Sequence, residues 1–164
     1  MSAAAEALAQ VEDPSTLHTL IFDCVRTAEL TKPDKQFLEQ FRECRNLSLA
    51  GLGLRSLKNL PDLPKLQHLS LRDNALLGDD LYNIKITYPS LRVLDLSNNQ
   101  IKELAHLYDL HQLELLEVIF LAPNPVQEQN NYRGNFWEKV AQCKVLDGFY
   151  KDMSLWHGES PFTR

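Results

Sequence analysis

A run of leucines closed by an asparagine, repeated at a fixed interval, is the feature that most constrains this chain. In the segment LRVLDLSNNQI the pattern L-x-x-L-x-L-x-x-N-x-L is filled by Leu91, Leu94, Leu96, Asn99 and Ile101. Leu94 and Leu96 are two residues apart, so an extended backbone places both side chains on one face. The segment is therefore predicted to form a short strand with one buried face and one face in water.

The same pattern recurs 25 residues earlier and 25 residues later. These copies are Leu66, Leu69, Leu71, Asn74 and Leu76, and Leu116, Ile119, Leu121, Asn124 and Val126. Looser copies begin at Leu17 and Cys44, with Val25 and Leu52 in place of the asparagine. The recurrence predicts an α/β fold, a right-handed leucine-rich repeat solenoid of about five coils, with a parallel concave sheet and short helical or 3₁₀ returns on the convex side. The alternative is an ordinary α/β domain rich in leucine.

The asparagine of each complete copy falls where the chain leaves the strand and turns inward. An amide side chain both donates and accepts hydrogen bonds, so it can pair with the backbone of its own turn and of the neighbouring coil. We therefore expect Asn74, Asn99 and Asn124 to form an internal ladder. Because Val25 and Leu52 replace the amide in the first two copies, the ladder should begin only at Asn74.

We divide the chain into an N-terminal capping helix in residues 1–14, repeats in residues 15–130, a C-terminal cap in residues 131–150 and a tail in residues 151–164. The open end coils of a solenoid need such caps, because their apolar interior would otherwise meet water. For residues 1–5 a frayed end is the alternative. In the C-terminal cap, Tyr132, Phe136 and Val140 lie on one helix face. The sequence leaves open whether the tail covers the concave or the convex face.

The returns between strands carry their own local signals. Phe37, Leu38 and Phe41 have helical spacing, and Leu54, Leu57, Leu60 and Leu63 recur every third residue, which favours a 3₁₀ return. Asp79 precedes an apolar helical pattern, so we expect it to cap that helix rather than to bind a metal or act as an acid. His106 and His111 do not share a helical face, so we expect solvated surface histidines.

Composition excludes several classes of protein. The formal net charge of -5 argues against direct binding of nucleic acid through a basic patch. No window approaches the roughly 18 uninterrupted apolar residues of a membrane span, and the N-terminal residues lack the features of a secretory signal. The three cysteines form no C-x-x-C pair, and Cys44 and Cys143 occupy apolar repeat positions. We therefore expect reduced, buried cysteines, a nuclear or cytoplasmic location, no cofactor and a monomer.

The segment YRGNFWEKVAQCKVLDG resembles the cap motif of the acidic leucine-rich nuclear phosphoprotein family. In that motif a Tyr-Arg pair, here Tyr132 and Arg133, opens a helix, and Leu-Asp-Gly, here Leu146, Asp147 and Gly148, closes the last strand. The segments NLPDLPKLQHLSLRDN and YPSLRVLDLSNNQIKEL look like repeats of the same family, so the resemblance covers roughly residues 12–152. The cap is similar in the leucine-rich A-prime subunit of a spliceosomal particle and in leucine-rich phosphatase regulators.

The resemblance implies a nuclear protein-binding module of the type that binds or chaperones histones or inhibits protein phosphatase 2A. The family carries a long acidic tail after its repeats, whereas this sequence ends HGESPFTR. Whether such a tail is naturally absent or was removed stays open. Since electrostatic attraction to basic partners depends on such a tail, histone chaperoning is less secure than binding in general. The alternative is a scaffold that holds an RNA-binding protein in a ribonucleoprotein, as the A-prime subunit does.

Alternate residues of each strand are predicted to face the concave side and to form the partner-binding surface. These residues are Asn46, Ser48, His68, Ser70, Arg72, Val93, Asp95, Ser97, Val118 and Phe120. Val93, Val118 and Phe120 would be exposed and could anchor a partner, with Phe120 as the aromatic centre. The alternative is that the cap or the tail, through Trp156, covers this patch.

Catalysis is disfavoured by the residues present. His68, Ser70 and Asp95 project from neighbouring predicted strands, as an acid-base group would. An open, shallow sheet excludes little water, however, and no Gly-rich phosphate loop, metal-spaced cluster or nucleophile elbow occurs. We therefore expect polar residues on a wet face and no enzyme.

Overall fold

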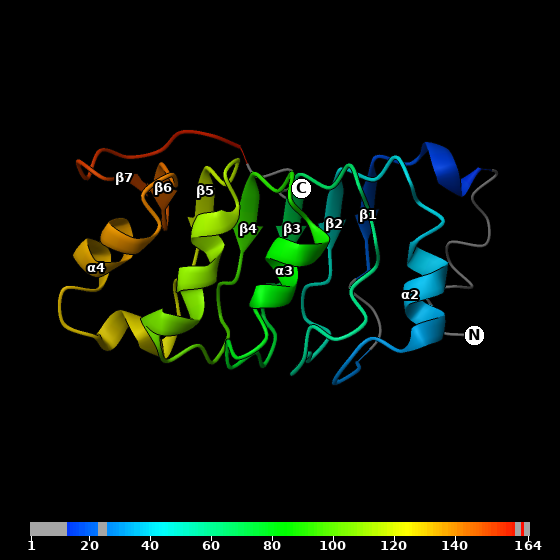
Figure 1. Ribbon diagram of the computed structural model, residues 1–164, viewed down its shortest axis with the longest axis horizontal. Coiled ribbons are helices and arrows are strands. Elements are labelled where there is room, and N and C mark those ends of the chain that lie inside the picture. Colours follow the sequence, from blue (N-terminus) through cyan, green and yellow to red (C-terminus); the bar gives the residue numbers. More distant parts are fainter. Residues whose placement is uncertain (1–12, 23–25, 160–161, 163–164) are drawn as a thin grey trace.

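The computed structural model describes residues 13–22, 26–159 and 162 as a stack of coils with one strand each (Figure 1). Its strands are β1 (Thr19–Ile21), β2 (Asn46–Ser48), β3 (His68–Ser70), β4 (Val93–Asp95), β5 (Val118–Phe120), β6 (Val145–Leu146) and β7 (Phe149–Tyr150). Its helices are α2 (Lys32–Leu38), α3 (Tyr82–Thr87) and α4 (Tyr132–Lys139), with 3₁₀ segments η1 (Pro14–Thr16), η2 (Leu104–Gln112) and η3 (Pro125–Glu128). The capping helix predicted within residues 1–14 lies almost wholly outside the described residues, as does Val25.

The strands form one open sheet in the order of the chain, from β1 to β7. Neighbours from β1 to β6 are parallel, and β7 folds back antiparallel to β6. The helices and 3₁₀ segments lie in front of this sheet in Figure 1, which leaves its other face as the inner wall of the solenoid. This arrangement confirms the predicted α/β leucine-rich repeat fold, because the strands lie side by side in the order of the chain with one return segment after each.

The regular leucines build the core because each strand turns one side chain inward. The inward residues Leu20, Leu47, Leu69, Leu94, Ile119 and Leu146 are aligned by the strand register and are all buried. Cys44 and Cys143 are buried free thiols, and burial raises the pKa of Cys44 to about 11 and that of Cys143 to about 12. Both thiols are therefore protonated at neutral pH.

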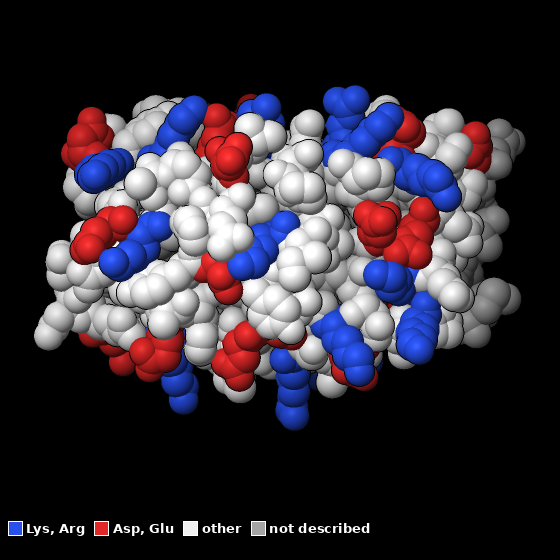
Figure 2. Space-filling model, viewed as in Figure 1, with Lys and Arg blue, Asp and Glu red and all other residues white. Residues whose placement is uncertain are grey.

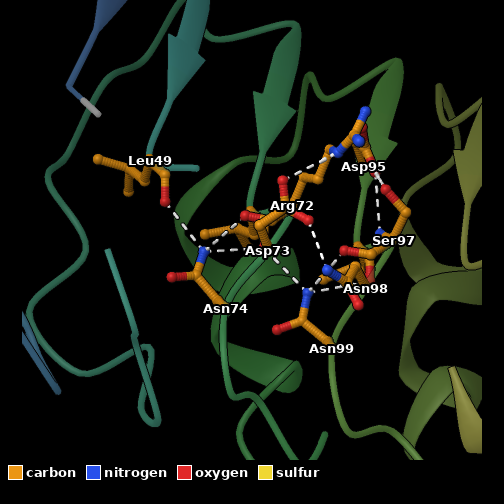
Figure 3. A network of polar contacts seen from close by, with 10 residues as sticks. Leu49, Arg72, Asp73, Asn74, Asp95, Ser97, Asn98 and Asn99 are labelled. Carbon is orange, nitrogen blue, oxygen red and sulfur yellow. Dashed lines mark hydrogen bonds and ion pairs between the residues drawn. The ribbon is translucent and has the colours of Figure 1, made fainter. Parts of the chain in front are cut away.

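The asparagines lie in the interior where the strands end. Asn99 accepts a hydrogen bond from the Leu76 backbone N–H (3.0 Å) and donates to the carbonyl oxygens of Leu71 and Leu96 (2.9 and 3.0 Å). Asn74 and Asn124 make equivalent bonds one coil earlier and one coil later. Each amide therefore joins two successive coils through buried backbone groups (Figure 3).

The returns differ from the sequence expectations in three places. Residues 54–63 form one turn at Lys58 and Asn59 and no 3₁₀ helix, although their leucines are buried, because Pro61 lacks the N–H donor that such a helix needs. Asp79 is not a helix cap, since α3 begins at Tyr82 after the turn that follows Gly78. Its carboxylate instead lies 3.4 Å from His106, whose half-buried ring packs against Gly78 and is not a solvated histidine.

The C-terminal cap closes the far end of the core with α4. Tyr132, Phe136 and Val140 are buried under it, at the spacing expected for one helix face. Asp147 accepts hydrogen bonds from the N–H groups of Leu121 (2.6 Å) and Ala122 (2.8 Å), and from the Tyr132 hydroxyl (3.1 Å). The carboxylate therefore binds the exit of β5 much as the ladder amides bind earlier exits.

Candidate protein-binding surface

Two rows of side chains run across the concave face, one from the first and one from the third residue of each strand. The first row is Thr19, Asn46, His68, Val93, Val118 and Val145, and the second is Ile21, Ser48, Ser70, Asp95 and Phe120. Ser48 and Ser70 are buried in the crowded centre of the face. Val118 is only 7% exposed, so the expectation of an exposed Val118 is wrong: Val93 and Val145 flank it in the row.

A chain of hydrogen bonds crosses the first three strands. The Asn46 amide donates to the Thr19 hydroxyl (2.8 Å), and its oxygen pairs with Nδ1 of His68. Burial, together with the charge of Arg92, lowers the pKa of His68 below its usual value. His68 is therefore neutral at pH 7, so its Nδ1–H donates to Asn46 and its Nε2 remains an acceptor.

A hollow of about 480 Å³ lies beside the C-terminal ends of β3, β4 and β5. It is lined by Arg72, Asp73, Asp95, Ser97, Asn98, Phe120, Ala122 and Pro123. Figure 3 shows the Arg72 side chain extending from β3 toward Asp95, while its Nε lies 3.1 Å from Asp73. Asp95 accepts from both the backbone and the hydroxyl of Ser97, which is buried. The sequence pattern missed Asp73, Asn98 and Pro123, because they follow the strands and lie in the turns.

The aromatic side chain of this face, Phe120, is covered in part by the chain itself. After β7 the chain turns and runs back along the row of strands (red in Figure 1). We call residues 151–159 the strap. Its Trp156 ring lies 5.7 Å from the Phe120 ring, between centroids, at an interplanar angle of 56°. The alternative raised above, that Trp156 covers the patch, therefore holds at Phe120, where the strap contacts the concave face.

The three side chains considered for catalysis are not linked. Ser70 is buried, His68 pairs with Asn46, and Asp95 pairs with Ser97. Among the described residues no hydrogen bond joins any two of the three, and no group of His, Cys, Asp or Glu has the geometry to hold a metal ion. The surface consists of polar and apolar groups on an open wall.

Charge is evenly mixed on the opposite face. Figure 2 shows acidic and basic side chains alternating over the returns, with uncharged atoms between them. Over the part of this face that the structure describes, no large area carries one sign of charge. Within the described ranges, no helix has the length and apolar character needed to cross a bilayer.

Residues 37–157 match the leucine-rich repeat family. Two curated relatives, both acidic leucine-rich nuclear phosphoprotein 32 family member A, from Drosophila pseudoobscura pseudoobscura and Drosophila melanogaster, are 35% identical over 111 residues. The match covers 68% of this chain but only 41% and 42% of those proteins, so the chain spans less than half of their length. This finding confirms the resemblance drawn from the cap motif.

Two solved structures share the fold. The Drosophila melanogaster SNF/U2A' complex contains a chain that is 32% identical, with a TM-score of 0.64, and the match covers 79% of this chain and 70% of that one. Internalin C2 from Listeria monocytogenes is 22% identical with a TM-score of 0.58, over 81% of this chain and 52% of that one, and supports the fold alone. The chain therefore belongs to the leucine-rich repeat family, whose members serve as protein-binding modules.

Proposed function

We propose that this chain is a non-catalytic module of the nucleus that holds a protein partner on its concave face. The observation that carries this proposal is the open inner wall, in which polar Asn46, His68 and Arg72 and apolar Val93 and Phe120 present partly or fully accessible side chains across several coils. A continuous row of this kind matches an extended partner surface better than a small substrate, because its accessible side chains are spread over several coils. The names of the Drosophila relatives support the nuclear assignment.

The partner class favoured by this kinship is a histone or protein phosphatase 2A. The net charge of -5 supports a basic partner, since long-range attraction speeds the encounter of oppositely charged proteins. Because the match covers less than half of the phosphoprotein relatives, these activities are proposed for the repeat domain through its own concave face.

A second candidate is a scaffold that holds an RNA-binding protein. It is favoured by the likeness to a chain of the SNF/U2A' complex, which extends over 70% of that chain and therefore over most of its length. The same concave face would serve both functions, so the two candidates differ in partner and not in surface.

The test compares one substitution on each face of the solenoid. Val93→Arg places a large side chain on the concave row, and Ile86→Arg places the same side chain on α3 of the convex face, where Ile86 is 69% exposed. Purified core histones, protein phosphatase 2A and a single RNA-recognition domain protein serve as separate probes in titrations. We expect Val93→Arg to weaken binding of the true partner at least tenfold and Ile86→Arg to leave it unchanged. Equal losses would contradict a concave site, and the probe that binds decides between the candidates.

A further inference from the structure

The strap is attached to the solenoid mainly at its base. A short hairpin is formed as the Tyr150 N–H donates to the Ser154 carbonyl oxygen (2.9 Å) and the Trp156 N–H donates to the Gly148 carbonyl oxygen (2.8 Å). Leu155 forms a β-bridge with Phe149. These bonds hold the strap beside the cap, and they place Trp156 within reach of the concave face.

Only one side chain of the strap buries itself against the strands. Met153 and Leu155 are 57% and 55% exposed, whereas Trp156 is half-buried against Phe120. The other described residues of the strap are exposed as well. An indole on a single ring is a small contact for a segment of this length, so the strap is held at its base and can be exchanged at its tip.

The position of Trp156 coincides with the surface best suited to anchor a partner. Phe120 is half-buried, borders the 480 Å³ hollow together with Ala122 and Pro123, and stands beside Asp95 in the concave row. Large aromatic side chains in such pockets dominate the affinity of many interfaces. The chain therefore places its own aromatic anchor on the site that a partner of the concave face would use.

We propose that the strap is a built-in competitor, and that the partner enters this end of the concave face as an extended segment that places a large aromatic side chain of its own on Phe120. The inference rests on the proposed concave binding and adds the chemistry of the anchor. Trp156 is the evidence for an aromatic anchor, since its indole, carried on a short extended segment, already fits the site at Phe120. Binding and strap release are thereby coupled.

The first experiment measures whether the strap is closed in the free protein. Trp137→Phe leaves Trp156 as the single tryptophan of the full chain. We expect acrylamide to quench Trp156 at least twice as effectively when Phe120→Ala is added to the Trp137→Phe chain. The matched control, Ile86→Ala in the same chain, should leave quenching unchanged. Unchanged quenching in the Phe120→Ala chain would overturn the closed strap, and this result does not depend on any partner.

The second experiment offers the anchor in trans to the full chain. The probe is a labelled peptide of residues 149–159, FYKDMSLWHGE, and its control carries alanine in place of tryptophan. We expect the tryptophan peptide to bind Trp156→Ala at least tenfold more tightly than it binds the unaltered chain. Adding Phe120→Ala should abolish this binding, and the alanine peptide should not bind. A thermal melt of Trp156→Ala checks that the fold is intact.

Four results would overturn the proposed competitor. The peptide could bind both chains equally, or a lysine-rich peptide of equal length could bind Trp156→Ala more tightly, which would point to a basic anchor. Sedimentation of the unaltered chain could also reveal a dimer that Phe120→Ala abolishes, which would assign the site to a second copy. A protein partner could also bind Val93→Arg more weakly but bind Trp156→Ala and the unaltered chain with equal affinity. The proposed function would then stand, and the strap would not be a competitor. If the strap is closed but none of the protein probes binds, the proposed function fails and the closed strap stands.

Discussion

The second coil and the three coils after it make the same inward turn by different means. In the later coils Asn74, Asn99 and Asn124 bind the turn from within, and in the second coil Leu52 occupies that position. The residue before the ladder position has a positive φ in the second, third and fourth coils, where it is Gly51 (70°), Asp73 (57°) and Asn98 (52°). The second, third and fourth coils therefore share this backbone shape, although the second has no amide of its own to stabilise it, and in the fifth coil Pro123 precedes Asn124.

The two kinds of coil also differ in where hydrogen bonds join them to their neighbours. The later coils carry their own buried amides, whereas the second coil is bound by Asn74 of the third coil, at its Leu49 carbonyl oxygen and its Leu54 N–H. On the concave face, Asn46 also joins the second coil to Thr19 on one side and to His68 on the other. A buried bond that is lost leaves backbone groups unpaired, but groups at a surface regain water. The second coil should therefore depend on Asn74 of the third coil more than on any polar side chain of its own.

The largest effect is expected for Asn99→Ala. This change leaves the buried Leu76 N–H without its acceptor and removes one of the two amide donors from each of the Leu71 and Leu96 carbonyl oxygens, which should cost about 3 kcal/mol of unfolding free energy. Urea unfolding measures the loss. Gln100→Ala, at the exposed neighbouring position, is the matched control and should change stability by less than about 0.5 kcal/mol. Equal urea midpoints for Asn99→Ala and Gln100→Ala would show that the buried amide does not stabilise the later coils.

Asp147→Ala should come next, at about 2 kcal/mol, because the Leu121 and Ala122 N–H groups lose their acceptor at the end of the ladder. Asp147→Asn keeps an acceptor oxygen and tolerates the positive φ of 52°, so its cost should be smaller. Thermal melts of both variants provide the measurement. If the asparagine variant loses as much as the alanine variant, the negative charge matters and the cap is not an extension of the amide ladder.

A smaller effect is expected in the second coil, whose turn has no amide of its own. Gly51→Val forces a β-branched residue to a φ of 70° and should cost about 1–2 kcal/mol. Gly51→Asn, which copies Asn98 of the fourth coil, should cost about 0.5 kcal/mol or less, and no atom lies within 4 Å of an added Cβ. Urea unfolding separates the two. A costly asparagine would show that the turns are not equivalent.

The smallest effect is expected for the pH dependence of stability that His68 contributes. Its pKa is lowered in the folded chain, so the native state binds fewer protons than the unfolded state near pH 6. Stability should therefore fall slightly as the pH drops from 7 through the usual histidine pKa of about 6.5. His68→Gln should remove this part of the slope in melting temperature. An unchanged slope would show that burial beside Arg92 does not favour the neutral ring of His68.

The architecture could be predicted because its signal is local and periodic. The 25-residue spacing of Leu66, Leu91 and Leu116 fixes which side chains face inward, and Tyr132 and Asp147 carry the cap motif. Details that depend on packing between coils could not be predicted in the same way. Helix caps illustrate this limit, since a carboxylate such as Asp79 can turn to a histidine from the next coil.

The candidate surface was predicted by register but not by exposure. Alternation assigns Val118 and Phe120 to the concave face, yet it does not say that Val118 is buried there or that a later segment returns to cover Phe120. The contact between Trp156 and Phe120 joins residues 36 positions apart, and no periodic pattern in the strap predicts it. Contacts of this kind depend on where the chain turns back, which short-range patterns leave undetermined.

The sheet order also has a mechanical consequence. Among the described residues, every strand pairs only with the strands before and after it in the chain, so their hydrogen bonds do not close the stack upon itself. Thermal opening can therefore advance coil by coil from an end, and amide protons should exchange with solvent in that sequence. A ligand lying along the inner wall would clamp several coils at once, and slower exchange would map its footprint along the whole row.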